Sequence, residues 1–281
     1  MRERAVVGIA QWLAAPGRPR ENLETAIGFI EELAGRGCDL VLLPEYWACG
    51  FDWTTLGEDA AAAAEPLDGS RCAALATAAG TNGVWLAAGT VPEQLEGGIA
   101  NTALLFDAAG ELRATHRKAH LYAPLGEDRV FVAGDRLTTC ATEPFGTVGL
   151  SVCFDGDFPE VARAMRRAGA RVIAHPSAYE LEAATWWDAL YPANALANGQ
   201  WWLMANQCGT TGAGTILGAS RVVAPDGRVV AEAPRATAGE TPEPFLLVAE
   251  LDVVAELARV DRDNAVLWDL ARPELYGAPG S

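Results

Sequence analysis

The chain has 281 residues, half of them hydrophobic, and a formal net charge of -16 with an isoelectric point of about 4.6. This charge disfavours nucleic acid and anionic membrane as partners, because both would repel an acidic surface. The apolar content is sufficient for a large core, and no internal repeat or shift in composition divides the chain, so we expect residues 1–281 to form a single domain.

The six cysteines lie far apart, with no C-x-x-C pair and no zinc-like spacing. This pattern favours a reducing compartment over a disulfide scaffold. Glu3, Gly8 and Gln11 interrupt the basic and apolar parts that a signal peptide needs, so we predict a first strand there instead. No apolar run reaches the length of a membrane span. We therefore expect a cytoplasmic protein.

Short apolar runs alternate with segments of helical periodicity. The first run covers residues 6–10, and a helix is predicted over residues 21–35. Further strands are predicted over residues 40–43, 84–88, 102–106, 111–116, 148–152, 172–174, 202–205, 220–224, 228–231 and 245–251. Further helices are predicted over residues 71–79, 159–168 and 185–197. The glycine-rich segment 209–214 is interpreted as flexible. Strands and helices that alternate early in the chain, followed by hairpins late in the chain, predict an α/β protein with mixed sheets.

Three ionisable residues follow predicted strands: Glu45, Lys118 and Cys153. Each has an ordinary explanation when taken alone, as a solvated loop glutamate, a surface lysine or a buried small thiol. In α/β folds, however, ligands gather outside the carboxyl ends of strands. A structural cysteine would normally lie inside an apolar run, whereas Cys153 stands where the chain turns. We therefore predict that the three side chains meet in one pocket.

Together these residue types can hydrolyse an amide. Because a free cysteine is mostly protonated at neutral pH, it needs a base, and a partly desolvated Glu45 can supply one. Lys118 and the backbone N–H of Phe154 can stabilise the oxyanion that develops on the substrate. Pro159 predicts a helix N-terminus nearby, which also favours negative charge. This chemistry requires no metal and no organic cofactor.

Several motifs together resemble a known family. They are LPE at residues 43–45, HRKAHL at 116–121, CFD at 153–155 and FPE at 158–160. In the order Glu, Lys, Cys they resemble the nitrilase superfamily of carbon–nitrogen hydrolases, over nearly the whole chain. The resemblance implies a four-layer αββα sandwich with two mixed β-sheets.

The same resemblance implies roles for individual residues. Glu45 would be the general base, Lys118 would stabilise the tetrahedral intermediate and Cys153 would form a thioester. Glu127 looks like the second glutamate of the family, which would position Lys118 and the substrate, with Asp128 as the competing candidate. The resemblance also implies a homodimer or a larger homo-oligomer.

The branch within the superfamily is indicated by the residues after the cysteine. Phe154-Asp155 replaces the Trp-Glu that usually follows in nitrilases, and it is similar to the amidase and carbamoyl-amide branches. An amidase acting on a small carboxamide is the first expectation. An N-carbamoyl amine or amino acid amidohydrolase is the alternative, followed by a nitrilase or a non-catalytic scaffold. Asn194 and Ala197 stand where many members carry Arg and Glu, so an expected bracing ion pair is absent.

Candidates for the substrate pocket come from positions near the strand ends. Aromatic walls are predicted from Tyr46, Trp47, Phe154, Tyr179 and Trp187, although such residues also serve as core packing. His175 follows another strand and would either line the cleft or cap the strand. The acidic charge, with Asp155 or Asp157, favours a cationic amide as substrate. His116 and His120 lie four residues apart, but without the glutamate and the helix of a metalloprotease motif they do not predict a metal site.

Overall fold

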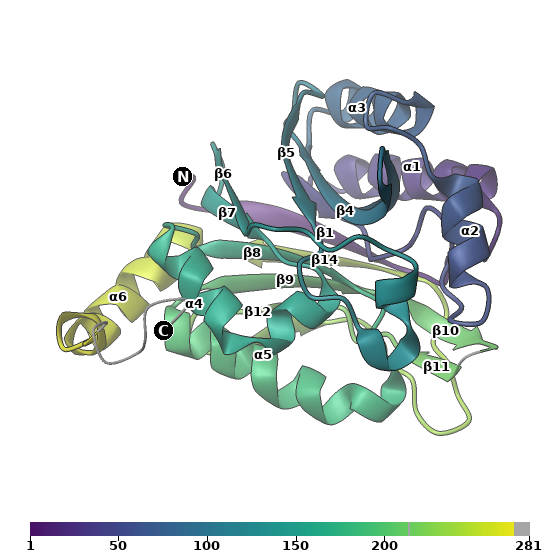
Figure 1. Ribbon diagram of the computed structural model, residues 1–281. Helices are drawn as coiled ribbons and strands as arrows, with labels where there is room; N and C mark the ends of the chain where they lie inside the picture. Colours follow the sequence, from purple (N-terminus) through teal and green to yellow (C-terminus); the bar gives the residue numbers. More distant parts are fainter. Residues whose placement is uncertain (213, 273–281) are drawn as a thin grey trace.

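The computed structural model describes residues 1–212 and 214–272. Two six-stranded sheets face each other, and helices cover their outer faces (Figure 1). Within the described residues, no helix combines the length and the apolar character that crossing a membrane requires. The predicted αββα sandwich with two mixed sheets is confirmed.

The first sheet combines parallel and antiparallel pairing. Its strands, in spatial order, are β14 (Phe245–Leu251), β1 (Ala5–Gln11), β2 (Leu40–Leu42), β3 (Trp85–Leu95), β4 (Gly98–Phe106) and β5 (Leu112–Arg117). The central strands β1, β2 and β3 are parallel, and the outer pairings are antiparallel. The carboxyl end of β2 therefore lies in the interior of the sheet, where side chains from the neighbouring strands can approach it.

The second sheet repeats this plan. Its order is β13 (Val229–Glu232), β12 (Arg221–Val223), β9 (Trp201–Asn206), β8 (Val172–Ser177), β7 (Gly146–Leu150) and β6 (Thr138–Thr142). Strands β7, β8 and β9 are parallel. The segment interpreted as flexible instead forms a hairpin of β10 (Cys208–Thr211) and β11 (Gly214–Leu217). Cross-strand pairing joins residues 208–211 to residues 214–217, which the glycine-rich composition did not indicate.

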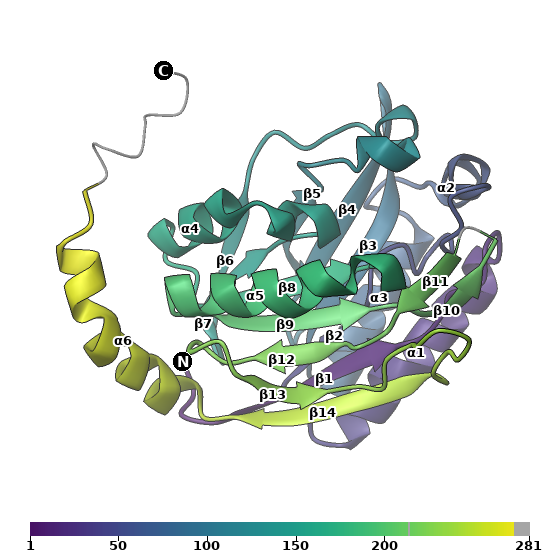
Figure 2. The ribbon, with the colours of Figure 1, turned by 90° about the horizontal axis from the view of Figure 1, so that it is seen from below.

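The helices form the two outer layers. Helices α1 (Pro19–Gly35) and α3 (Ser70–Asn82) cover the first sheet, and α4 (Pro159–Arg167) and α5 (Ala184–Asn198) cover the second (Figure 2). The short helix α2 (Leu56–Ala63) lies beside the first sheet. The C-terminal helix α6 (Val253–Asp269), which the sequence predictions did not include, extends away from the end of β14 (Figure 2).

Alternating side chains explain why the layers stack in this order. Leu40 and Leu42 of β2 point into the core between the two sheets, while Val41 points toward the layer of α1 and α3. On the second sheet, Val172 packs between the sheets and Ile173 packs against α4 and α5. Successive residues of a strand face opposite sides. A strand that is apolar on both faces must therefore be covered on both faces. Each sheet is covered by the other sheet on its inner face and by helices on its outer face, which gives four layers.

Candidate active site

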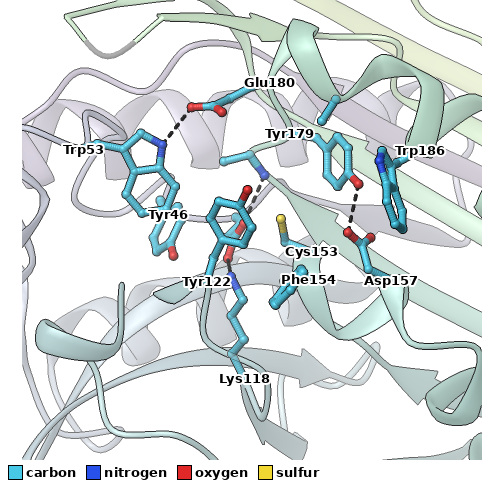
Figure 3. Close-up of a pocket in the computed structure, with 13 residues that line it drawn as sticks. Tyr46, Trp53, Lys118, Tyr122, Cys153, Phe154, Asp157, Tyr179, Glu180 and Trp186 are labelled. Atoms are coloured by element: carbon cyan, nitrogen blue, oxygen red, sulfur yellow. Dashed lines mark hydrogen bonds and ion pairs between the residues drawn. The ribbon is translucent and has the colours of Figure 1, made fainter. Parts of the chain in front are cut away.

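One cavity of about 250 Å³ lies where the strand ends of both sheets converge (Figure 3). Glu45, Lys118 and Cys153 all line it, so the predicted convergence of these three residues is correct. The complete lining consists of Glu45, Tyr46, Trp53, Lys118, Tyr122, Cys153, Phe154, Asp157, Ala178, Tyr179, Glu180, Ala183 and Trp186. Two of the three reactive residues come from the first sheet and the thiol from the second, so the site forms only when the sandwich does.

Cys153 occupies a strained turn between β7 and α4. Its φ is +44°, in the left-handed region, which costs a non-glycine residue on the order of 1–3 kcal/mol. The turn projects the sulfur into the cavity between Tyr122, Phe154 and Tyr179 (Figure 3). Burial raises the pKa of the Cys153 thiol well above its ordinary value, and the nearby charge of Glu45 adds to this effect. The resting group is therefore a thiol that needs a base.

Glu45 is buried and fixed through both of its carboxylate oxygens. Oε1 accepts hydrogen bonds from Lys118 Nζ and Asn101 Nδ2, both at 2.9 Å, and Oε2 accepts one from the backbone N–H of Ala178 at 3.0 Å. Burial raises the pKa of Glu45, although the charge of Lys118 and a hydrogen bond with Cys153 oppose the rise. A carboxylate with a raised pKa beside a thiol can accept and return a proton near neutral pH.

Lys118 is clamped between two glutamates. Its ammonium donates to both oxygens of Glu127, at 2.9 and 2.8 Å, besides its bond to Glu45. Burial opposes this charge, but Glu127 and Glu45 hold the pKa of Lys118 above its usual range. Glu127 also accepts hydrogen bonds from the Tyr46 hydroxyl and, at 2.6 Å, from the backbone N–H of Tyr122. Glu127 is buried whereas its predicted competitor Asp128 is exposed.

The backbone just before Glu45 packs closely against a glycine of the neighbouring strand. Gly89 in β3 has a φ of +58°, and a Cβ atom on it would lie 2.0 Å from the carbonyl oxygen of Pro44. Strand β3 is irregular here, since its pairing with β4 shifts register between Ala87 and Thr90. Thr90 Oγ1 in turn accepts a hydrogen bond from the backbone N–H of Tyr46 at 2.8 Å. Only glycine permits this close approach of two backbones.

Gly89→Ala is therefore expected to lower the free energy of unfolding by about 3 kcal/mol, through backbone strain and displacement of Pro44. Urea denaturation measures this loss. Gly28→Ala is the matched control, because Gly28 lies in α1 with open space around it and alanine favours helices. Equal stability of the two variants would contradict the steric explanation.

Asp155, predicted to bind substrate, does not line the cavity. It is fully buried beneath the cysteine turn, where its carboxylate accepts hydrogen bonds from His116 Nε2 at 2.9 Å and His120 Nδ1 at 2.8 Å. Burial opposes ionisation, but these bonds hold the pKa of Asp155 well below its usual range. Because a carboxylate only accepts, both ring nitrogens carry hydrogen. Asp155 thus joins the Lys118 segment to the Cys153 turn.

Three other predicted pocket residues lie in the core. Trp47 packs in the layer of α1 and α3 and donates to the carbonyl oxygen of Ala88 at 2.6 Å. Trp187 is buried against the second sheet. His175 is also fully buried and bonds Ser151 Oγ at 3.1 Å, and burial lowers its pKa to about 3. None of these three lines the cavity, and each side chain is instead packed in the core.

Tyr46, Phe154 and Tyr179 do line the cavity, as expected. The sequence predictions missed its other walls, which are Trp53, Tyr122, Ala178, Glu180, Ala183 and Trp186. One of them could have been found. Trp187 and Tyr191 are four residues apart and share the buried face of α5, so the adjacent Trp186 turns toward the rim, where it is 57% exposed.

Asn194 compensates for part of the missing family ion pair. Its side chain is buried and donates to the carbonyl oxygen of Gly156 at 3.0 Å, so α5 still holds the cysteine turn. Ala197 is exposed and makes no equivalent side-chain bond. Across residues 1–212 and 214–272, there is no group of three or more His, Cys, Asp and Glu side chains arranged to hold a metal ion.

Comparison with known proteins identifies the family. The family model described as carbon-nitrogen hydrolase matches residues 5–259. The chain belongs to this family. This carbon–nitrogen hydrolase is 30% identical to deaminated glutathione amidase from Mus musculus, over 99% of the chain and 86% of the relative. It is also 30% identical to 2-oxoglutaramate amidase from Bacillus subtilis, over 92% of the chain and 95% of the relative.

Solved structures lead to the same superfamily. Nit3 from Saccharomyces cerevisiae, a member of branch 10 of the nitrilase superfamily, aligns with a TM-score of 0.82 and 26% identity, covering 92% of this chain and 94% of that one. A variant of the amidase from Nesterenkonia sp. AN1 in complex with butyramide aligns with a TM-score of 0.76 and 27% identity, covering 95% and 97%. The protein is thus an enzyme of the class that hydrolyses carbon–nitrogen bonds other than peptide bonds.

Proposed function

We propose that this carbon–nitrogen hydrolase is an amidase that converts a small carboxamide to a carboxylate and ammonia through a thioester on Cys153. The observation that carries the proposal is the shared cavity of Glu45, Lys118 and Cys153, with Lys118 held between Glu45 and Glu127. These residues provide a nucleophile, a base and a fixed positive charge, so the chemistry is complete without a cofactor.

In the first half of the reaction, Glu45 takes the proton of the Cys153 thiol as the sulfur attacks the amide carbon. The oxyanion is stabilised by Lys118 and by the backbone N–H of Phe154. Protonation of Glu45 removes its charge from Lys118, which frees an N–H of the ammonium for the oxyanion. Glu45 then protonates the leaving nitrogen, the carbon–nitrogen bond breaks, and ammonia departs from the thioester.

In the second half, Glu45 accepts a proton from water as the water oxygen attacks the thioester carbon. Collapse of this second intermediate breaks the carbon–sulfur bond. The proton returns from Glu45 to the sulfur, and the carboxylic acid leaves. One base thus serves both halves, and its raised pKa suits both directions of transfer.

The names of relatives indicate several amide substrates. One relative is named for deaminated glutathione, another for 2-oxoglutaramate, and the Nesterenkonia amidase was crystallised with butyramide. A further structure of that amidase carries acrylamide added at its active-site cysteine. These names support an amide rather than a nitrile as the substrate class.

The test is release of ammonia from a panel of short aliphatic amides, ω-amides, carbamoyl amines and nitriles. Turnover of amides by the wild type, and none by Cys153→Ala, is the expected result. Mass spectrometry after treatment with acrylamide should find one adduct on Cys153. Turnover confined to carbamoyl amines or to nitriles would replace the amidase assignment, and no turnover with no adduct would point to a non-catalytic scaffold.

Single-domain folding of residues 1–281, self-association and a cytoplasmic location remain predictions. Self-association is supported by exposed apolar side chains on α5, since Trp186 is 57% and Leu196 is 50% exposed. Sedimentation velocity measures the assembly directly.

A further inference from the structure

The cavity wall has an uneven distribution of charge. Lys118 is the sole basic side chain among the lining residues, and its three contacts of 2.8–2.9 Å all go to Glu45 and Glu127. An ammonium has three donors, so Lys118 has none left for a carboxylate on the substrate. Two further carboxylates, Asp157 and Glu180, line the same cavity.

Asp157 is a pre-positioned carboxylate. The hydroxyl of Tyr191 donates to its Oδ1 at 2.6 Å, and the hydroxyl of Tyr179 donates to its Oδ2 at 3.0 Å. Each oxygen retains a further acceptor site, because a carboxylate has about four. Neither donor is charged, and in the described part of the chain Asp157 forms no ion pair. Burial raises the pKa of Asp157, while its hydrogen bonds with Tyr191 and Tyr179 and the charge of Lys118 oppose the rise.

Glu180 occupies another part of the wall, next to Trp53 (Figure 3). Its Oε1 accepts a hydrogen bond from Trp53 Nε1 at 2.8 Å, and no lysine or arginine among the described residues pairs with it. Burial raises its pKa as well, and the neighbouring Glu182 contributes to the rise. Figure 3 shows the Cys153 sulfur between these two regions, with Asp157 below Trp186 and Glu180 beside Trp53.

Most of the remaining wall residues are aromatic. Trp53, Tyr122, Phe154, Tyr179 and Trp186 all border the cavity. The faces of aromatic rings attract cations and give nothing to a carboxylate. A pocket of aromatic faces with two unpaired carboxylates therefore favours positive charge, and its acidic groups repel negative charge.

Resting on the proposed amidase function, we propose that the substrate is an amide whose other end carries an amine or another cation. The cation lies against Asp157 and the aromatic faces, Glu180 adds attraction from the opposite wall, and amides that carry a carboxylate are discriminated against. This specificity is a property of Asp157 and Glu180, separate from the bond-breaking residues Glu45, Lys118 and Cys153.

Three amides with the same methylene chain test the preference: δ-aminovaleramide is a cation, hexanamide is neutral and adipamate is an anion. Ammonia release by the purified wild-type chain gives kcat/KM for each. We expect the cation to exceed hexanamide by about 10- to 100-fold, the range of a charge-assisted hydrogen bond, and adipamate to be the poorest. Added salt should reduce the advantage of the cation, because ions screen the attraction.

Variants then assign the preference to residues. Asp157→Asn should lower the ratio of kcat/KM for δ-aminovaleramide over hexanamide by about 10-fold or more. Glu180→Gln should lower the same ratio by a smaller factor, since Glu180 is nearer the solvent-exposed rim. Glu143→Gln is the matched control: Glu143 is exposed and outside the lining, so its loss of charge should leave the ratio unchanged.

The outcomes separate the two proposals. Hydrolysis of hexanamide at a rate equal to that of δ-aminovaleramide, or faster hydrolysis of adipamate, overturns the cationic preference and leaves the amidase function standing. Hydrolysis of none of the three, while other amides of the panel are hydrolysed, overturns the cationic preference alone, and hydrolysis of no amide at all overturns both proposals. Since the wild type alone gives the order of the three amides, the preference can be refuted even if Asp157→Asn fails to fold.

Discussion

Glu45→Gln should lower kcat for amide hydrolysis about 10³-fold, because the variant cannot accept the thiol proton or pass a proton to the leaving nitrogen. The effect is large because Glu45 acts in both halves of the proposed reaction. Steady-state ammonia release measures it. We expect kcat to fall far more than KM changes, since the glutamine amide occupies the same volume and leaves the aromatic walls in place.

Reactivity of the sulfur provides the control for this variant. The charge of Glu45 raises the pKa of Cys153 and the charge of Lys118 lowers it. Removing the first charge leaves the second, so the thiol of Glu45→Gln should ionise more readily and still react with iodoacetamide. A variant that loses amide turnover but is still alkylated at Cys153, with its buried cysteines unreactive, has lost its base and kept its fold. Retention of amide turnover would instead mean that another group, or water, takes the thiol proton.

The proposed catalytic residues were predictable from the sequence because their signals are local. Glu45, Lys118 and Cys153 each follow a predicted strand, and the ends of such strands are visible without knowledge of the partners. The parallel arrangement of β1–β3 and of β7–β9 brings the ends of β2 and β7 to one edge of the sandwich. Two successive antiparallel pairings, of β4 with β3 and of β5 with β4, give β5 the direction of β3, so Lys118 reaches the same edge.

The remainder of the pocket was less predictable because it depends on side-chain direction. An error of one position exchanged Trp187 for Trp186, and Trp47 points to the opposite face of its segment from the cavity. Asp155 was misassigned for a different reason. Its hydrogen-bond partners His116 and His120 lie 39 and 35 residues away along the chain, so nothing near Asp155 marks it as a buried structural carboxylate.

The fold shows the same contrast. Strands buried on both faces, such as β2 and β8, are continuous apolar runs and were found. The edge strand β6 has the sequence TTCAT, with mostly half-buried side chains, and its existence depends on pairing with β7. The hairpin of β10 and β11 likewise gains its structure from cross-strand bonds, which composition does not reveal.

Asp155→Asn should lower the free energy of unfolding by about 3 kcal/mol at neutral pH, since it disrupts a buried charged hydrogen-bond network. Oδ1 of Asp155 accepts from the backbone N–H of Ala119 at 3.1 Å and from both the backbone N–H and Nδ1 of His120, at 2.9 and 2.8 Å. Oδ2 accepts from His116 Nε2 at 2.9 Å and the Val152 N–H at 3.1 Å. An amide NH₂ in either place would face donors.

The pH dependence identifies charge as the cause. The folded-state pKa of Asp155 is lowered relative to the unfolded value of about 3.9, so the carboxylate stabilises the fold above that value and loses its contribution as the pH falls toward the folded pKa. The stability difference between wild type and Asp155→Asn should therefore shrink below about pH 4. Urea denaturation at neutral pH and at acid pH measures both values, with Asp128→Asn as the exposed control.

The same variant tests how the site is assembled. The donors around Asp155 come from the segment just after Lys118 and from Val152, which directly precedes Cys153. Asp155 thus sets the spacing between the proposed oxyanion-stabilising charge and the nucleophile without touching the substrate. Under conditions where the variant remains folded, kcat should fall while KM changes little, because the cavity walls are unaltered. A stability loss that is the same at both pH values, or a change in KM without a fall in kcat, would mean that the charge of Asp155 neither stabilises the fold nor positions the site.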